Sequence, residues 1–248
     1  MPGSFAVTPF QLLGLVAIFI IARAALTLRP VKTNSRGKSL AFAREYLDPF
    51  IVAGLAAFLL ITFVARTYYI PSASMVPTLQ IGDVLLVNKF EYRFRAPSEG
   101  DIVVFPPPIV TTDDFIKRVI GRPGDKLRIH AGVVYINDLP IAEPYVNQHP
   151  DYELVVKNYG IYVDGQPLGR EAANLPPRSA WSAPDRIPRE CYFMMGDNRN
   201  DSDDSHVWGF AQTSGTFATG PVRGQKAHFT GHAFVVFWPP SRIHALGR

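Results

Sequence analysis

Two long apolar runs near the start of the chain constrain the fold most strongly. The first run, Met1 to Ala22, has no charged residue, and the second, Pro49 to Ala65, has 17 residues without a charge. A helix that crosses a bilayer needs about 20 mainly apolar residues, with about 17 as the lower limit. With their flanks both runs qualify, so we expect one transmembrane helix within residues 1–28 and a second within residues 49–66. A buried core helix is the alternative interpretation of either run.

A short basic segment, residues 29–48, separates the two runs. A secretory signal peptide would have basic residues before its apolar stretch, and Met1 to Gln11 has none, so we expect the first helix to be retained. The positive-inside rule places the basic segment in the cytoplasm. Residues 67–248 then form one extracytoplasmic, or periplasmic, domain of a two-span protein of the cytoplasmic (inner) membrane. The basic residues of the segment are Arg29, Lys32, Arg36, Lys38 and Arg44.

The pattern of residues 67–248 indicates a mainly β domain. Short runs rich in branched residues alternate with turn signals, and no stretch has a convincing period of 3.6 residues. Residues 145–189 are rich in Pro, Asn and Asp and are predicted to be a variable, loop-rich insertion. The predicted strands are Asp83–Phe90, Asp101–Phe105, Phe115–Gly121, Lys126–His130, Gly132–Ile136 and Ala233–Trp238.

Composition argues against an internal disulfide and against nucleic-acid binding. The single cysteine, Cys191, cannot form an internal disulfide. The net charge of +4 comes partly from the basic segment, and no cluster of Lys and Arg interleaved with aromatic residues follows it. We therefore do not expect nucleic acid as a partner.

The stretch after the second apolar run holds two serines inside a frame of prolines, "IPSASMVPTLQIGDVLLVNKF". Taken alone, Pro71–Pro77 is most simply a turn, because proline and serine are common turn residues. A serine is also a nucleophile when a neighbouring base takes its proton. If the prolines hold the backbone extended, Ser72 and Ser74 project to the same side.

A candidate base lies in "DDFIKRVIGRPGD". Lysine can serve as a base if burial lowers its pKa from about 10.4 toward neutrality, whereas arginine stays charged. In the predicted strand Phe115–Gly121, Lys117 and Arg118 point to opposite faces, and each has apolar neighbours on its own face. Periodicity does not decide which face is buried, but only Lys117 could act as a base.

The third stretch is "MMGDNRNDSDDSHVWGF". A surface turn or a calcium loop is the simple interpretation. The acidic residues do not alternate as an EF-hand loop requires, and no bidentate glutamate follows them. Turn residues directly after a strand can instead bring a hydroxyl to a site and brace it.

Together, the three stretches resemble the bacterial type I signal peptidases, also called leader peptidases. "PSASMVPTLQIGD", "GDIVVF" with "DFIKRVIGRPGD", and "GDNRNDSDDS" with "WGF" occur in the family's order, after two apolar runs. The resemblance covers essentially the whole chain. It implies two N-terminal transmembrane helices and an all-β catalytic domain of the signal-peptidase type, carrying a membrane-bound serine endopeptidase.

The resemblance also implies a role for each matching residue. Ser74 matches the nucleophile and Lys117 the general base of a Ser/Lys dyad. Ser72 matches the hydroxyl that forms the oxyanion hole with the backbone N–H of Ser74, and Ser202 matches the serine that orients the lysine. The other matches are polar residues that hold the site in shape, namely Asp197, Arg199 and Asp204.

The implied substrates are exported preproteins, cut after small-residue, Ala-x-Ala-like sites, and the implied surroundings are a phospholipid bilayer beside the secretion translocon. No cofactor and no metal are implied. The chain departs from the family pattern at two positions. Ala73 stands where glycine is frequent, and His206 stands where arginine is usual, so that a charge pair with Asp204 becomes pH-dependent or is lost.

Three alternatives stay open at this point. A specialised peptidase of the same superfamily, maturing conjugation or pilus proteins, would share every residue named above. A membrane-anchored β binding module would use Ser74 only to shape a turn. A Ser/His/Asp hydrolase would use His206 as its base, and His206→Ala would then abolish activity.

Overall fold

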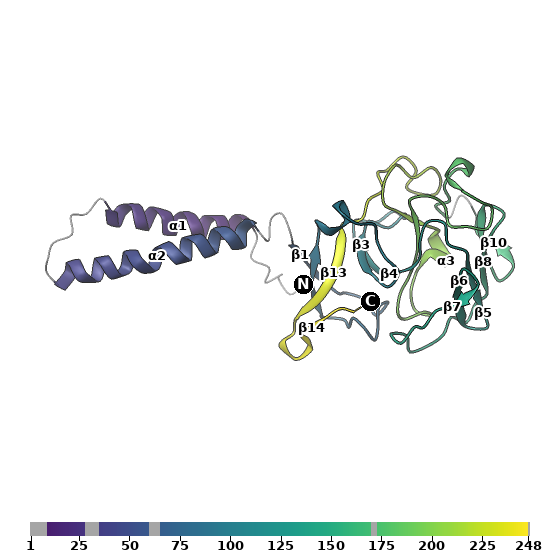
Figure 1. Ribbon diagram of the computed structural model, residues 1–248, viewed down its shortest axis with the longest axis horizontal. Helices are drawn as coiled ribbons and strands as arrows, with labels where there is room; N and C mark the ends of the chain where they lie inside the picture. Colours follow the sequence, from purple (N-terminus) through teal and green to yellow (C-terminus); the bar gives the residue numbers. More distant parts are fainter. Residues whose placement is uncertain (1–8, 28–34, 60–64, 170–172, 248) are drawn as a thin grey trace. The chain divides into compact units, whose positions relative to one another are not determined.

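The computed structural model describes residues 9–27, 35–59, 65–169 and 173–247 (Figure 1). The chain divides into two compact units, Met1–Thr67 and Tyr68–Arg248. The first unit contains helices α1 (Pro9–Thr27) and α2 (Ser35–Leu59). The two helices pack against each other, with a salt bridge of 2.7 Å from Arg23 Nε to Asp48 Oδ1 and a contact between the rings of Phe19 and Phe50.

Neither helix, within the described residues, combines the length and the apolar character that crossing a bilayer requires, so the prediction of two transmembrane helices is wrong. Charged residues lie within both helices. Helix α2 (Ser35–Leu59) begins within the basic segment and includes Arg36, Lys38 and Arg44. Helix α1 contains Arg23. Residues 1–8, 28 and 60–64 of the predicted spans lie outside the described residues.

The second unit is built from two β-sheets (Figure 1), as the mainly β prediction for this part of the chain requires. The eight-stranded sheet has the order β1 (Ala65–Tyr69), β2 (Val84–Asn88), β13 (Gly231–Trp238), β3 (Ile102–Phe105), β4 (Phe115–Gly121), β11 (Cys191–Met195) and β12 (Ala211–Gln212), with β14 (His244–Ala245) paired to β13. The six-stranded sheet has the order β10 (Gln166–Pro167), β9 (Gly160–Val163), β8 (Leu154–Lys157), β5 (Leu127–His130), β6 (Val133–Ile136) and β7 (Leu139–Pro140). The short helices are η2 (Glu91–Arg93), η3 (Arg178–Ala180), α3 (Ser205–Trp208) and η4 (Pro240–Arg242).

All six strands predicted from branched residues are confirmed, as β2 to β6 and β13. Strand β5 alternates buried and exposed side chains, as a half-covered sheet requires, and its Leu127 and Ile129 enter the core. Strand β4 is different, because β3 pairs with one of its edges and β11 with the other, and its last five residues are all buried. A strand buried on both faces hides the alternation on which sequence analysis depends.

The segment 145–189 contains regular structure that its composition did not indicate. It contributes β8, β9 and β10, which extend the six-stranded sheet from β5. The turn between β8 and β9 consists of Asn158 and Tyr159, both with positive φ, at 50° and 61°. Two-residue hairpin turns of type I′ need positive φ at both positions, usually supplied by Asn-Gly. Tyrosine in the second position gives no turn signal, so the hairpin escaped prediction.

Candidate active site

Ser74 lies in a turn that leads out of β1, and not in an extended strand as the prolines suggested. The backbone N–H of Leu79 donates a hydrogen bond of 2.9 Å to the carbonyl of Met75. Met75 and Leu79 are buried in the core, and they anchor the turn. The turn nevertheless brings the two hydroxyls together, because Ser72 Oγ lies 3.4 Å from Ser74 Oγ.

Lys117 and Arg118 are both buried, on opposite faces of β4, with 3% and 1% of their surfaces exposed. Arg118 donates to both carboxylate oxygens of Asp197, from Nε at 2.8 Å and from Nη2 at 2.7 Å. Thr78 Oγ1, from the turn that carries Ser74, also donates to Asp197, at 2.5 Å. Asp197 therefore ties the turn that carries Ser74 to strand β4.

Lys117, Ser202 and Asp204 form a continuous hydrogen-bonded group. Lys117 Nζ donates to Ser202 Oγ at 2.5 Å, and Ser202 Oγ donates to Asp204 Oδ1 at 2.6 Å. Lys117 Nζ also lies 3.3 Å from Asp204 Oδ1, whose side chain has no exposed surface. The other carboxylate oxygen accepts the backbone N–H of Gly196 at 2.8 Å. Burial raises the pKa of Asp204, while the Lys117 charge and the hydrogen bonds from Ser202 and Gly196 oppose that shift.

The segment that supplies Ser202 and Asp204 also contacts the turn that carries Ser74. Asn198 donates from its backbone N–H to the carbonyl of Ser74 at 3.1 Å, and from its side chain to the carbonyl of Ala73 at 3.2 Å. A Cβ atom added at Gly196 would overlap with both Ser202 Oγ and the Ser74 carbonyl oxygen. Glycine is therefore required at this position for the two segments to approach each other.

Five of the seven predicted site residues thus form two adjoining groups. One is the pair of hydroxyls of Ser72 and Ser74, and the other is the group of Lys117, Ser202 and Asp204. Within the described part of the chain, no hydrogen bond joins Ser74 Oγ directly to Lys117 Nζ. Contact between the two groups runs through the backbone of residues 196–198.

Arg199 extends the site toward a segment that sequence analysis did not single out. Its guanidinium forms a bidentate ion pair with Glu143, in which Nη1 donates to Oε2 at 2.9 Å. The ring of Tyr145 lies against two guanidinium groups, with its centre 3.8 Å from Cζ of Arg118 and 6.0 Å from Cζ of Arg199. Glu143 precedes Arg199 by 56 positions, and no local pattern marks it or Tyr145 as a site residue.

His206 lies against Tyr152 and not beside Ser74. The two rings are stacked, with centroids 4.4 Å apart and an interplanar angle of 17°. Burial lowers the pKa of His206 below its ordinary value of 6.5. No hydrogen bond links His206 to Ser74 among the described residues, so the geometry does not support a Ser/His/Asp arrangement.

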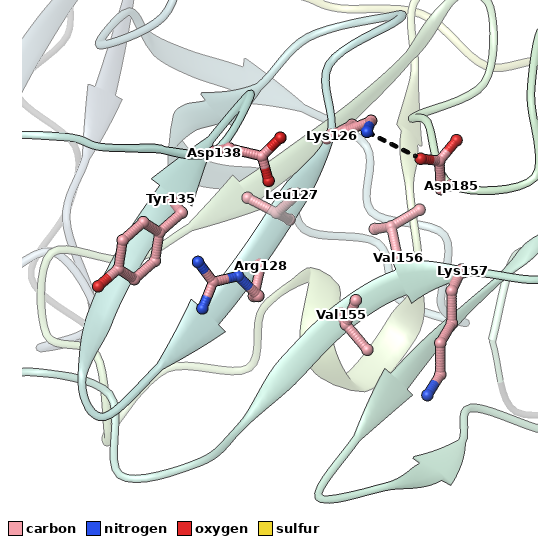
Figure 2. A pocket seen from close by; sticks show the side chains of 9 residues that line it. All are labelled: Lys126, Leu127, Arg128, Tyr135, Asp138, Val155, Val156, Lys157 and Asp185. Atoms are coloured by element: carbon pink, nitrogen blue, oxygen red, sulfur yellow. Dashed lines mark ion pairs between the residues drawn. The ribbon is translucent and has the colours of Figure 1, made fainter.

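A pocket of about 190 Å³ lies elsewhere, on the six-stranded sheet (Figure 2). Its lining includes Arg128, Tyr135 and Lys157, and a salt bridge of 3.3 Å between Lys126 and Asp185 crosses its edge (Figure 2). None of the predicted site residues lines it. The candidate active site is therefore defined by its side-chain contacts and not by this pocket.

Comparison with known proteins gives a consistent result. The family described as "Signal peptidase, peptidase S26" matches residues 43–238. The "Probable signal peptidase I-2" of Synechocystis sp. is 38% identical over 229 residues, which cover 89% of this chain and 86% of that protein. Signal peptidase I of Leptolyngbya laminosa is 35% identical over 193 residues, covering 75% of each chain. Signal peptidase I of Pseudomonas aeruginosa is 34% identical over 184 residues, covering 66% of this chain and 62% of that protein.

The matched region contains all three stretches that carried the resemblance, from "PSASMVPTLQIGD" to "GDNRNDSDDS". A membrane-anchored binding module does not account for such matches to peptidases. The family match spans well over half of the chain, and the Synechocystis relative is similar over most of both lengths. The resemblance to the type I signal peptidases is confirmed, and the chain belongs to the signal peptidase family, peptidase S26.

Proposed function

We propose that Ser74 and Lys117 form a catalytic Ser/Lys dyad with which this serine peptidase removes signal peptides from exported preproteins. The observation that carries the proposal is the buried group of Lys117, Ser202 and Asp204, whose segment contacts the turn of Ser74. An amine held in this way has one fixed direction and is shielded from water. The relatives named above are signal peptidases I, which supports the same substrate class for this chain.

The first chemical step requires Lys117 in its neutral form. The neutral amine takes the proton of Ser74 Oγ as this oxygen attacks the scissile carbonyl, and a tetrahedral oxyanion forms. When the intermediate collapses, the C–N bond breaks and the protonated amine gives its proton to the leaving nitrogen of the mature protein. Lys117 then activates a water molecule, which hydrolyses the ester between Ser74 and the signal peptide.

The oxyanion needs two hydrogen-bond donors close to Ser74. Ser72 Oγ, 3.4 Å from Ser74 Oγ, and the backbone N–H of Ser74 are the proposed pair. Removing one donor of an oxyanion hole typically costs about 2.7 to 4 kcal/mol of transition-state stabilisation. Ser72 is exposed, so an incoming peptide can reach it.

The hydrogen bond between Lys117 and Ser202 leaves Lys117 free to accept the proton of Ser74. Ser202 Oγ donates its own proton to Asp204, and therefore offers a lone pair to Lys117 Nζ. This fixes the direction of the amine without consuming the lone pair that must accept the Ser74 proton. In enzymes without substrate, catalytic hydrogen bonds are often long and shorten only in the substrate complex. We therefore propose that the bound substrate brings Ser74 and Lys117 into direct contact.

Three polar residues are proposed to support the dyad without reacting themselves. Asp197 holds the nucleophile's turn through Thr78 and is held by Arg118. Arg199 is paired with Glu143, and Asp204 accepts hydrogen bonds from Ser202 and from the backbone of the same segment. Each would act by keeping Ser74, Lys117 or Ser202 in place.

The proposed function is tested by incubating the purified full chain with a preprotein and sequencing the N-terminus of the product. We expect release of the mature protein after a small-residue, Ala-x-Ala-like site. The Ser74→Ala variant should release none, whereas Ser214→Ala, which removes an exposed hydroxyl bonded to Glu190, should act like the wild type. Failure of the wild type to cleave, or equal cleavage by Ser74→Ala, would contradict the proposal.

Family membership implies a catalytic unit associated with a membrane outside the cytoplasm, and we propose a face that contacts the bilayer. Strand β13 exposes three aromatic side chains, Phe234 at 39%, Phe237 at 37% and Trp238 at 54%. Aromatic residues are enriched where proteins meet the membrane interface. With β13 at the membrane interface, the proposed active site would receive preproteins as they leave the secretion translocon.

We expect brominated phospholipids in vesicles to quench the fluorescence of Trp238. The other two tryptophans, Trp181 and Trp208, are buried, at 8% and 1% exposure, so Trp238 is the one that lipid can reach. The matched control is Trp238→Phe, which keeps an aromatic ring but removes the reporter. Equal fractional quenching in the wild type and in this variant would contradict the proposed face.

A further inference from the structure

The stacked rings of His206 and Tyr152 are half-buried, and His206 lies two residues after Asp204 of the proposed catalytic group. His206 belongs to α3, and Tyr152 comes just before β8, in the segment predicted as an insertion. His206 Nδ1 and Tyr152 Oη are both buried, and neither has a hydrogen-bond partner among the described residues. Buried polar atoms without partners are rare, and each calls for an explanation. Here two of them lie on the two rings of one stack.

Several charged groups act on the His206 ring from the elements packed around it. Burial lowers the pKa of His206, and of the charges the nearby Asp204 opposes this shift most strongly. Asp203 and Asp151 also favour the protonated ring, while Lys117 disfavours it. The lowered pKa of His206 favours the uncharged imidazole at neutral pH, and the ring takes up a proton as the medium becomes more acidic.

A protonated His206 does not suit the stacked position. The imidazolium carries N–H donors on both ring nitrogens, whereas Nδ1 is buried here without an acceptor. An unpaired buried donor is unfavourable, so the charged ring should leave the stack for a nearby carboxylate. Asp204 has the largest electrostatic effect on His206, and its oxygens already serve Ser202, Lys117 and the Gly196 N–H.

The backbone couples His206 to Asp204 as well. Asp204 immediately precedes α3, and its carbonyl accepts the N–H of Val207 at 2.8 Å and that of Trp208 at 3.2 Å. A ring fixed on the first turn of this short helix therefore fixes the backbone of Asp204. Movement of His206 would be transmitted to the carboxylate that holds Ser202.

The residues just before Tyr152 are hydrogen-bonded to Asn200, which belongs to the segment that carries Ser202. Asn200 accepts the backbone N–H of Asp151 at 3.2 Å, and its side-chain amide donates to the carbonyl of His149 at 3.1 Å. The residues before Tyr152 are thus fastened to the segment that carries Ser202. This gives the predicted insertion a contact with the proposed active site.

We propose that Tyr152 and His206 are positioning residues, in which the uncharged imidazole stacked on Tyr152 keeps Asp204 directed at Ser202 and Lys117, and protonation of His206 releases it. The inference rests on the proposed function. An arginine, which the family usually has in place of His206, would be charged at every working pH and could not respond in this way.

The pH profile of preprotein cleavage tests the proposal. With the purified full chain, kcat/KM is measured from about pH 5 to about pH 9, together with the melting temperature at each pH. We expect the wild type to lose activity at acidic pH. His206→Phe keeps an aromatic ring on Tyr152 and cannot titrate, so its profile, scaled to its own maximum, should lose less activity at acidic pH than that of the wild type. The matched control is His130→Phe, at an exposed histidine paired with Glu153, which should keep the wild-type profile.

The contribution of the stack is measured separately at the pH of maximal activity. His206→Ala and Tyr152→Ala should each lower kcat by about tenfold, because small displacements of catalytic groups are costly. Tyr152→Phe keeps the ring and loses only a hydroxyl without a partner, so it should recover most of the activity lost in Tyr152→Ala.

An acidic loss that persists unchanged in His206→Phe would belong to another group and would overturn the proposal. Equal activity of Tyr152→Ala and the wild type would overturn it as well. A wild type that does not cleave the preprotein at any pH would instead contradict the proposed function, and this inference with it. Scaling each profile to its own maximum separates the pH response from a general loss of folded protein.

Discussion

Replacing Lys117 by arginine is expected to abolish preprotein cleavage, although the side chain keeps its positive charge. Guanidinium stays protonated in proteins and cannot take the proton of Ser74. General-base catalysis typically contributes about 100-fold to 10,000-fold, and we expect kcat to fall by at least this range. Because Lys117 is 3% exposed and lies against Ser202 and Asp204, the larger guanidinium must also displace its neighbours.

The same substitution at Lys126 is the matched control. Lys126 is partly exposed and forms a salt bridge with Asp185 that arginine can also make. Lys126→Arg should retain wild-type activity, and Lys117→Ala should be as inactive as Lys117→Arg. Single-turnover cleavage of a preprotein, with melting temperatures recorded in parallel, distinguishes loss of chemistry from loss of folding. Robust cleavage by Lys117→Arg would exclude Lys117 as the base.

The second large effect is expected at Asp204, on stability as well as on activity. Its carboxylate accepts hydrogen bonds from Ser202 Oγ and the Gly196 N–H, and it lies 3.3 Å from Lys117 Nζ in a buried salt bridge. Asp204→Ala leaves these buried donors without an acceptor. Removing one partner of a buried ion pair typically lowers the free energy of unfolding by about 3 to 5 kcal/mol. We expect denaturant titration to show a loss of unfolding free energy in this range. We also expect a large fall in kcat.

The neighbouring residue supplies the control for Asp204. Asp203 has the same side chain one position earlier, but it is exposed. Surface substitutions usually change stability by less than about 0.5 kcal/mol, and we expect this of Asp203→Ala. A stability loss of equal size in the two variants would show that the segment is sensitive to substitution in general. A stable Asp204→Ala protein would contradict the role of Asp204 in holding the group together.

Short stretches of the sequence contain most of the residues of the proposed site. Ser72, Ser74 and Lys117 lie in short stretches with unusual neighbours, and the "GDNRNDSDDS" stretch contains both partners of the lysine. What the stretches could not show is how they meet. The link from Asn198 to the Ser74 carbonyl joins residues that are far apart in the sequence, and only the folded chain brings them together.

The remaining parts escaped prediction for identifiable physical reasons. Glu143 and Tyr145 act through Arg199 and Arg118, and an ion pair between distant positions leaves no periodic trace in the sequence. The β8–β9 hairpin has no glycine in its turn. The two apolar runs contain no charge, but α1 extends past the first run to include Arg23, and α2 includes charged residues that precede the second run.

The central claim is that Ser74 attacks the substrate, and trapping the acyl-enzyme tests it most directly. The purified chain is mixed with excess preprotein, quenched in acid within the first turnover, digested and analysed by mass spectrometry. The peptide that contains Ser74 should carry the carboxyl-terminal acyl group of the signal peptide, and the adduct should be absent from Ser74→Ala. An adduct on any other residue, or release of the mature protein at the wild-type rate by Ser74→Ala, would exclude Ser74 as the nucleophile.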